Sequence, residues 1–443
     1  MTPELESLFE LLRFPSISTD SRHRGDVRAC AEWLAGNLAA MGLESRVDDT
    51  PGHPVVLAKS EAKPDRPTVL IYGHYDVQPV DPLELWDTPP FEPVLREGRI
   101  LARGATDNKG QLWAHALGVG AVLREEGDLP VNVILLFEGE EEVGSPNLGA
   151  YLEAHKDELG CDVIAVSDTG MVAPGVPTLG YGLRGIACCE VKVSAAKSDL
   201  HSGVYGGAVA NPATALARLL ATLHDANGRV AVAGFYDGVG LPEEWEREAW
   251  SALPIDESSI LKETGAPALS GEEGFSSWER LWARPTAEIN GMASGYQGEG
   301  SKTVLPSEAM AKLSFRLVPG QDPGDILAGV RRHFEERAAP GIRLQFVEGH
   351  SGEPYFCDPR SRHGQAACEA LREAFGREPV MIREGGSIPI INTFRRVLGV
   401  DTLLLGLALP DCRIHAPNEN FTVENFEGGI RMNRALLRAL AKA

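Results

Sequence analysis

Two polar residues close an apolar run early in the chain. In TVLIYGHYD, His74 and Asp76 are two positions apart. Strand residues two apart share a face, so both side chains can point to one site at the strand's carboxyl end. A metal-bound histidine usually donates its other ring N–H to a carboxylate, and Asp76 is available for that role. Taken alone, the pair also fits an ordinary polar surface turn.

Further carboxylates precede a helix or follow strands. Asp107 lies in RGATDNKGQ, directly before a helical pattern, where it could cap the helix or bridge two cations. The segment FEGEEEVGS follows the apolar VNVILLF and contains four glutamates, Glu138, Glu140, Glu141 and Glu142. A solvated acidic loop is one reading of this segment, and a group of carboxylates neutralised by cations is the other.

Two more candidate ligands follow apolar runs. Asp168 ends DVIAVSD, and His415 follows VDTLLLGLAL. Strands that each end in a histidine or an acidic residue would converge on one crevice at the edge of a parallel sheet. Imidazole and carboxylate ligands together suit zinc, manganese or cobalt.

No other catalytic motif competes with this constellation. The sequence contains no HExxH, GxSxG or P-loop. The string GYGLRG at 180–185 matches GxGxxG, but a strand pattern follows it rather than a helix. We interpret these residues as hinge and turn glycines, and the dinucleotide-binding reading is the weakest.

The elements that must position these residues belong to two patterns. Through the first 180 residues, apolar runs at 54–59, 68–73, 131–137 and 162–167 surround a helical segment from Gln111. This alternation predicts an α/β fold with a mostly parallel sheet and helices on both faces. The helical segments 361–376 and 425–443, with the apolar run 400–409, resemble more of the same domain.

From Ile186 the pattern changes. Alternating runs at 186–194 and 310–318, a strand from Ile342, and helices after Pro212 and from Asp325 need one more strand, at TAEING, to complete β-α-β-β-α-β. Four tryptophans within 227–286 predict an ordered helical elaboration of this domain. The predicted division is 1–185 for the first segment of the metal-binding domain, 186–357 for an inserted lid domain, and 358–443 for the second segment of the first domain; the roles of the first domain in catalysis and of the inserted domain in dimerisation are what a family resemblance implies.

Composition excludes several classes of protein. The 443 residues suffice for two to three domains. Lys and Arg total 42 against 63 Asp and Glu, and the resulting charge of −21 argues against a nucleic-acid partner. No apolar run approaches the ~20 residues that span a bilayer, and the N-terminus lacks a signal-peptide pattern. Seven cysteines without CxxC fit reduced thiols, which predicts a cytoplasmic protein with no membrane partner.

The motifs, taken in order, resemble a known family. GHYDVQPVDPLELWDTPPFEP, GRILARGATDNKG, EGEEEVGS, SDT, YGLRG, DLHSGVYGG, GEGSKTVLPSEA, SFRLVPGQDP, EGGSIPI and IHAPNEN are similar to motifs of the dizinc peptidases. That family includes carnosinases, cytosolic nonspecific dipeptidase, glutamate carboxypeptidase and succinyl-diaminopimelate desuccinylase. The resemblance covers nearly the whole chain and is greatest to the carnosinase-like dipeptidase branch.

The resemblance implies a role for each candidate. His74, Asp107, Glu142, Asp168 and His415 would bind two divalent metal ions, with zinc expected first and manganese or cobalt as alternatives. Asp107 would bridge the ions, with a cis peptide bond to Asn108. Asp76 would orient His74, and Glu141 would be the general base.

The inserted domain would supply further residues. His201 would stabilise the oxyanion across a homodimer, which Thr303 would also reach across, and Arg316 and Ser387 would hold the substrate's C-terminal carboxylate. The implied activity is hydrolysis of dipeptides or short peptides. An N-acyl amino-acid deacylase or desuccinylase of the same fold is the alternative, and a non-catalytic metal or peptide binder is the competing class.

Overall fold

The computed structural model describes residues 1–443, which form two compact units. Unit 1 contains Met1–Tyr181, Cys357–Ile382 and Ile390–Ala443, and unit 2 contains Gly182–Phe356 and Arg383–Pro389. The sequence assigned 383–389 to the catalytic domain, whereas contacts place this short segment in unit 2. No helix is both long and apolar enough to cross a membrane.

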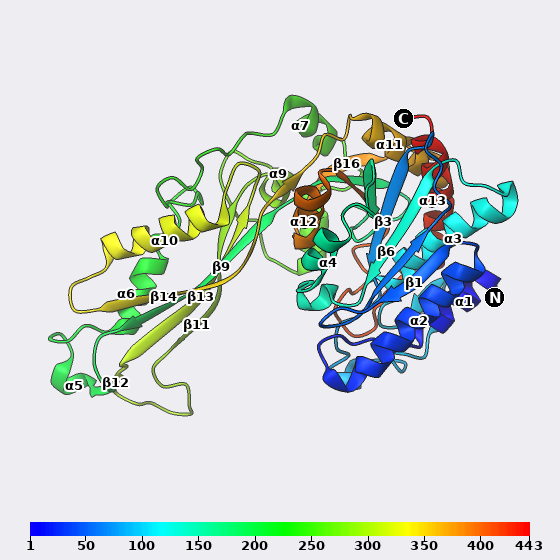
Figure 1. Ribbon diagram of the computed structural model, residues 1–443. Coiled ribbons are helices and arrows are strands. Elements are labelled where there is room, and N and C mark those ends of the chain that lie inside the picture. The colour runs from blue at the N-terminus through cyan, green and yellow to red at the C-terminus, as the bar shows by residue number, and fades with distance from the viewer. The chain divides into compact units, whose positions relative to one another are not determined.

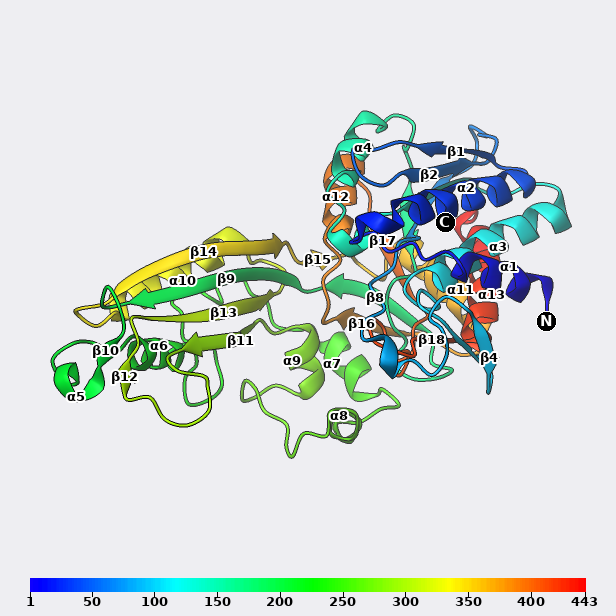
Figure 2. The ribbon, with the colours of Figure 1, turned by 90° about the horizontal axis from the view of Figure 1, so that it is seen from below.

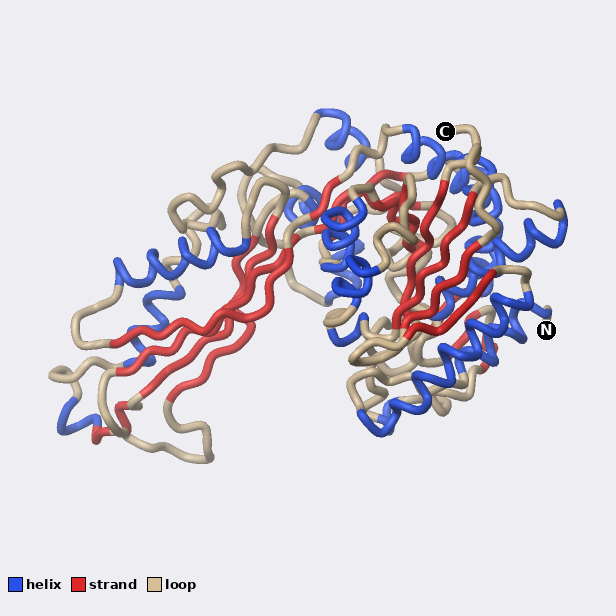
Figure 3. The backbone as a smooth tube through the Cα atoms, viewed as in Figure 1, coloured by secondary structure: helices blue, strands red, loops and turns tan.

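Unit 1 is built on a mixed sheet with a parallel centre, and its strands are drawn in red in Figure 3. Its strands, in spatial order, are β1 (Glu44–Asp48), β2 (Val55–Lys59), β6 (Asn132–Glu138), β3 (Thr68–His74), β7 (Val163–Val166), β17 (Thr402–Gly406) and β8 (Thr178–Leu183). The pairs β6–β3, β3–β7 and β7–β17 are parallel. The central four strands therefore end at one edge, which confirms the predicted fold class.

Helices cover both faces of this sheet (Figures 1 and 2). One face packs against α1 (Pro3–Leu12), α2 (Arg24–Ala40), α3 (Lys109–Glu126), α11 (Arg362–Phe375) and α13 (Val423–Leu440). The short helices α4 (Leu148–Ala154) and α12 (Pro389–Leu398) lie on the other face, where Tyr72 contacts Phe394 with ring centroids 5.1 Å apart.

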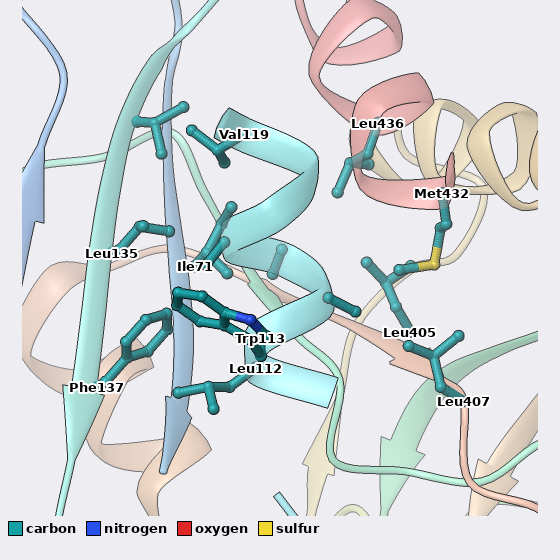
Figure 4. Packing of buried hydrophobic residues seen from close by; sticks show 14 of the residues in the cluster. Ile71, Leu112, Trp113, Val119, Leu135, Phe137, Leu405, Leu407, Met432 and Leu436 are labelled. Carbon is teal, nitrogen blue, oxygen red and sulfur yellow. The ribbon is translucent and has the colours of Figure 1, made fainter. Parts of the chain in front are cut away.

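Alternation along the strands produces the main core. Ile71 and Leu135 point from β3 and β6 toward Leu112 and Trp113 of α3, which in turn lies beside Met432 of α13 (Figure 4). These side chains are almost completely buried. Burial at ~25 cal/mol per Å² of apolar surface makes this the main stabilising contribution, and it fixes the strand ends that carry the polar residues.

Unit 2 is a two-layer α+β unit. Its four-stranded antiparallel sheet has the order β11 (Thr286–Ser294), β13 (Glu308–Leu317), β9 (Gly185–Ser194) and β14 (Arg343–Gly352). The helices α6 (Pro212–Leu220) and α10 (Pro323–Arg337) pack against one face through a core that includes Val191, Phe315 and Phe334. Strand β11 is the predicted TAEING strand, so the structure has the expected β-α-β-β-α-β order.

The tryptophan-rich segment of unit 2 is ordered and helical, as predicted. It contains α7 (Glu244–Ser251), α8 (Glu257–Thr264) and α9 (Ser277–Trp282). Trp282 contacts both Trp250 and Trp278, with ring centroids 5.4 and 5.1 Å apart.

Candidate metal centre

The parallel strand ends of unit 1 bring the predicted metal ligands together. His74, the last residue of β3, has a side chain that is only 1% exposed. Its Nε2 lies 3.1 Å from Asp107 Oδ1 and 3.9 Å from Asp168 Oδ1. Ligand atoms of His74, Asp107 and Glu142 all lie within 4.8 Å of one another.

His415 approaches the same carboxylate from the other side. Its Nε2 lies 2.8 Å from Asp107 Oδ2 and 3.3 Å from Glu142 Oε2. The two oxygens of Asp107 thus face two different imidazoles, which is the arrangement that a carboxylate bridging two cations requires. The structure does not use Asp107 as a helix cap, because Asn108 holds the N-cap position of α3.

Hydrogen bonds separate the roles of the four glutamates. Glu138 accepts from Tyr72 and Ser145, and Glu140 accepts from the backbone N–H of His53 and from Asn147. Both oxygens of Glu140 and Oε1 of Glu138 are therefore occupied by protein donors, whereas Glu138 Oε2 is buried without a partner.

Glu141 and Glu142 begin the 3₁₀ turn η3 (Glu141–Val143). Glu142 accepts from Gln78 at 2.7 Å, whereas no protein hydrogen bond engages the carboxylate of Glu141. Of the acidic run, Glu142 is therefore the candidate metal ligand and Glu141 is the candidate for proton transfer.

Asp76 positions two parts of the centre. Its backbone carbonyl lies 3.1 Å from His74 Nδ1, and its carboxylate oxygen lies 3.4 Å from the same nitrogen. The two carboxylate oxygens also accept from the backbone N–H groups of Glu141 and Glu142, at 3.2 and 3.1 Å. Asp76 therefore fixes the acidic turn as well as the imidazole, a second function that the sequence pattern did not reveal.

The donor set fits divalent metal ions. His74 Nε2 and Glu142 Oε1 are buried and have no hydrogen-bond partner, which leaves two inward-facing ligand atoms unsatisfied. Five carboxylates, Asp76, Asp107, Glu141, Glu142 and Asp168, surround two imidazoles. Imidazole nitrogens and carboxylate oxygens at this spacing are ligands for zinc, manganese or cobalt.

The pKa values reflect this crowding of charge. Burial raises the pKa of Asp168 to about 6, and burial also raises the pKa of Glu141 well above its usual value. Hydrogen bonds that His415 donates to the carboxylates of Asp107 and Glu142 raise its pKa to about 10. The raised pKa values of Asp168, Glu141 and His415 indicate a site with an excess of negative charge, which bound cations would relieve, whereas hydrogen bonds from His415 and His74 lower the pKa of Asp107.

Sequence reasoning missed a residue that supports the loop of Asp107. Glu419 is fully buried and accepts the backbone N–H groups of Gly104, Thr106 and Asp107 at 2.9–3.0 Å. It also pairs with Arg103 at 2.8 Å. The residue stands in the motif IHAPNEN, but its partners are more than 300 positions away, so only the fold reveals the contact.

The turns around Asp107 and His415 have unusual backbone geometry. The peptide bond between Asp107 and Asn108 is cis, as the resemblance implied, and Asn108 Nδ2 donates to Asp168 Oδ1 at 2.9 Å. Arg413, His415 and Asn418 all have positive φ, between 56° and 64°. Non-glycine residues held in this region are strained, and such strain concentrates at functional sites.

In unit 2, His201 and Thr303 lie close together in the two-stranded ribbon of β10 (Leu200–His201) and β12 (Val304–Leu305). Both are exposed, and the backbone N–H of Ser202 donates to the carbonyl of Thr303. His201 Nδ1 accepts from the N–H of Gly203 at 3.0 Å. A neutral His201 therefore carries its proton on Nε2, which leaves an exposed N–H donor.

The two proposed carboxylate-binding residues also meet within unit 2. Arg316 projects from β13, and its Nη1 donates to Ser387 Oγ at 3.1 Å. Ser387 Oγ in turn donates to the backbone carbonyl of Arg184. Arg316 pairs in register with Ile186 near the start of β9, so this site lies at one end of the sheet.

The chain is similar to known proteins over nearly its whole length. Residues 70–439 match the model of peptidase family M20/M25/M40. The chain is 32% identical to the Cys-Gly metallodipeptidase dug1 of Schizosaccharomyces pombe, covering 98% of this chain and 94% of that protein. It is 31% identical to the Beta-Ala-His dipeptidase of Homo sapiens, covering 98% and 85%.

A solved structure is similar over its full length. The M20 family metallo-carboxypeptidase Sso-CP2 from Sulfolobus solfataricus is 34% identical, with complete coverage of both chains and a TM-score of 0.88. These matches confirm the family resemblance that the motifs indicated.

Proposed function

Because this chain belongs to peptidase family M20/M25/M40, we propose that it hydrolyses dipeptides or short peptides that have a free C-terminal carboxylate. The observation that carries this proposal is the bridging geometry of Asp107, whose two oxygens face His74 and His415 beside Glu142. The relatives named as metallodipeptidases support the same activity.

Two divalent ions, zinc first and manganese or cobalt as alternatives, would occupy the centre. His74 and Asp168 would hold one ion, Glu142 and His415 the other, and Asp107 both. When bound, the ions would lower the pKa of the attacking water and would polarise the scissile carbonyl.

Glu141 is the general base in this mechanism. No protein donor engages its carboxylate, and burial raises its pKa. A carboxylate with a raised pKa accepts a proton from the attacking water and returns it to the leaving amine. Asp76 fixes the position of Glu141 through its backbone N–H at 3.2 Å.

Unit 2 supplies recognition. Arg316 binds the substrate's C-terminal carboxylate with Ser387, since a guanidinium fork matches the two oxygens of a carboxylate. His201, with its exposed Nε2–H, donates to the developing oxyanion, and Thr303 lies beside it.

Strand β9 separates these two functions. Arg316 is in register with Ile186, whereas His201 follows Ser194 at the other end of the strand. Eight residues of strand extend ~26 Å, but a dipeptide spans only ~7 Å. The two ends of the strand are therefore farther apart than one dipeptide is long, which favours contact of His201 and Arg316 of one chain with different substrate molecules. We infer that a second copy of the chain supplies His201 and Thr303, which requires a homodimer formed through unit 2.

The activity is tested with purified protein loaded with zinc or manganese. A panel of dipeptides, their C-terminal amides, longer peptides and N-acyl amino acids distinguishes a dipeptidase from a carboxypeptidase and from a deacylase. We expect hydrolysis of free dipeptides, and Glu141→Gln should abolish it. Turnover of N-acyl amino acids alone would favour the deacylase alternative, and a metal-loaded protein without activity on any substrate would indicate a binding protein.

The composite site is tested by mixing variants. His201→Ala and Glu141→Gln homodimers should each be nearly inactive. A heterodimer of the two has one site with an intact Glu141 and the partner's intact histidine, so about half of the sites per heterodimer should regain activity. No recovery after demonstrated subunit exchange would show that His201 acts in its own chain or not at all. A cytoplasmic location stays a prediction.

A further inference from the structure

Arg184 braces the segment that contains Ser387. Its backbone N–H donates to the carbonyl of Glu384 at 3.2 Å, and its Nε donates to the carbonyl of Gly385 at 3.1 Å. The backbone carbonyl of Arg184 accepts the hydroxyl of Ser387. A Cβ on Gly385 would lie 3.2 Å from Arg184 Nη2 and 3.3 Å from the carbonyl of Leu281, so glycine permits this close approach. Arg184 thus holds three polar groups of this segment, the carbonyls of Glu384 and Gly385 and the hydroxyl of Ser387.

Arg184 and Arg316 converge on Ser387 without an anionic partner. Ser387 Oγ accepts from Arg316 Nη1 and donates to the carbonyl of Arg184. Neither guanidinium has a carboxylate within ion-pair distance. A guanidinium carries five N–H donors, and each of these uses only one in a protein hydrogen bond. Two partly buried guanidiniums with spare donors, one bonded to Ser387 and the other to Gly385 two positions earlier, form a site for an anion with several oxygens.

The charge balance supports this interpretation. Burial, and secondly the positive charge of Arg316, lowers the pKa of Arg184 to about 10. Like charges in a partly buried site destabilise each other unless an anion binds between them or near them. Glu288 is the acidic residue whose charge acts on Arg184, and it lies on β11 without forming an ion pair with it.

We propose that Arg184 is a positioning residue for the substrate's C-terminal carboxylate, which orients Ser387 and places a second positive charge beside Arg316. This inference rests on the proposed function. The inference adds one residue to the proposed carboxylate pocket: the backbone carbonyl of Arg184 accepts from Ser387, and its side chain donates to Gly385. The string YGLRG, interpreted from sequence as hinge glycines, thus also contains a specificity residue.

The test compares Arg184→Met and Arg184→Lys with the wild-type enzyme, using alanyl-alanine and its C-terminal amide. Arg184→Met should raise KM for alanyl-alanine about 10- to 100-fold and change kcat by less than about 3-fold. KM for the amide should stay the same, because the neutral end does not need the second charge. Arg184→Lys keeps the positive charge, so its KM for alanyl-alanine should lie between the values of the wild-type enzyme and of Arg184→Met. The control is Arg331→Met, which removes an exposed arginine paired with Glu348 at 3.3 Å. This variant should leave KM unchanged for both substrates.

Calorimetric binding of alanyl-alanine to metal-free protein gives a second measurement that does not need turnover. Arg184→Met should weaken this binding by the same factor and leave binding of the amide unchanged. If loaded wild-type protein does not cleave dipeptides, the proposed function fails, but the binding measurement still tests the pocket. Equal effects on the free and amidated ligands, or no effect on either, would overturn the role of Arg184. If Arg184→Met does not fold, Arg184→Lys decides the question through the same ratio.

Discussion

Glu419 accepts the backbone hydrogen bonds that hold the loop of Asp107, so Glu419→Gln is the most informative test of how this loop is supported. The carboxylate accepts two donors on each oxygen, with Arg103 Nη1 and the N–H of Gly104 on Oε2. The N–H groups of Thr106 and Asp107 bind Oε1. Glutamine offers only one acceptor oxygen, so two donors would face its NH₂ group.

The magnitude follows from burial. The side chains of Arg103 and Glu419 are 1% and 0% exposed, so the substitution leaves a buried guanidinium without its counterion. Breaking a buried pair on one side costs about 3–5 kcal/mol. For a domain of this size each kcal/mol lowers Tm by about 2–4 °C, which gives an expected decrease of about 6–20 °C.

Thermal unfolding of metal-free protein, followed by circular dichroism, measures this effect without a contribution from bound metal. Glu427→Gln, which changes an exposed glutamate of α13, is the control and should shift Tm by less than about 2 °C. Arg103→Met with Glu419→Gln should be less destabilising than the sum of the two single changes, because no buried charge then lacks a partner. A decrease no larger than the control's, or strict additivity, would refute the assigned role of the pair.

Three further predictions concern the centre and its surroundings. Glu141→Gln should lower kcat by several orders of magnitude and keep the metal content, since it removes a proton acceptor; metal loss on elemental analysis would reassign the base. Asp107→Ala should lose both metals together, and retention of two tightly bound ions would contradict bridging. Hydrogen bonds from Arg46, with Lys59, hold the pKa of Glu158 below its usual 4.5. That stabilisation is present above about pH 4.5 and is lost as the pH falls through the pKa of the folded state. Glu158→Gln should therefore flatten the fall in Tm between about pH 5 and pH 3. An unchanged profile would show that the ion pairs of Glu158 with Arg46 and Lys59 contribute nothing to stability.

The sequence predicted the parts of the centre that depend on local periodicity. A parallel sheet brings the carboxyl ends of its strands to one edge, so residues such as His74 and Asp168 could be placed together from their positions after apolar runs. The same reasoning located the inserted α+β unit from its alternating strands. It could not tell which glutamates of the acidic run face the centre, because that depends on donors such as His53 and Tyr72 in distant segments.

Residues that act through other residues carry weaker sequence signals, and this explains what was missed. Glu419 and Arg184 are ordinary polar residues within motifs whose glycines and histidine attract the attention. Their importance comes from many simultaneous contacts, four for the carboxylate of Glu419 and three hydrogen bonds for Arg184, with partners about 200 to 300 positions away. A buried charge needs such a set of partners to offset its desolvation, so a network of this kind is specified by the whole fold rather than by local spacing. The ligand types of the centre can therefore be predicted from short motifs, whereas the contacts that hold Glu419 and Arg184 in place depend on distant segments of the chain.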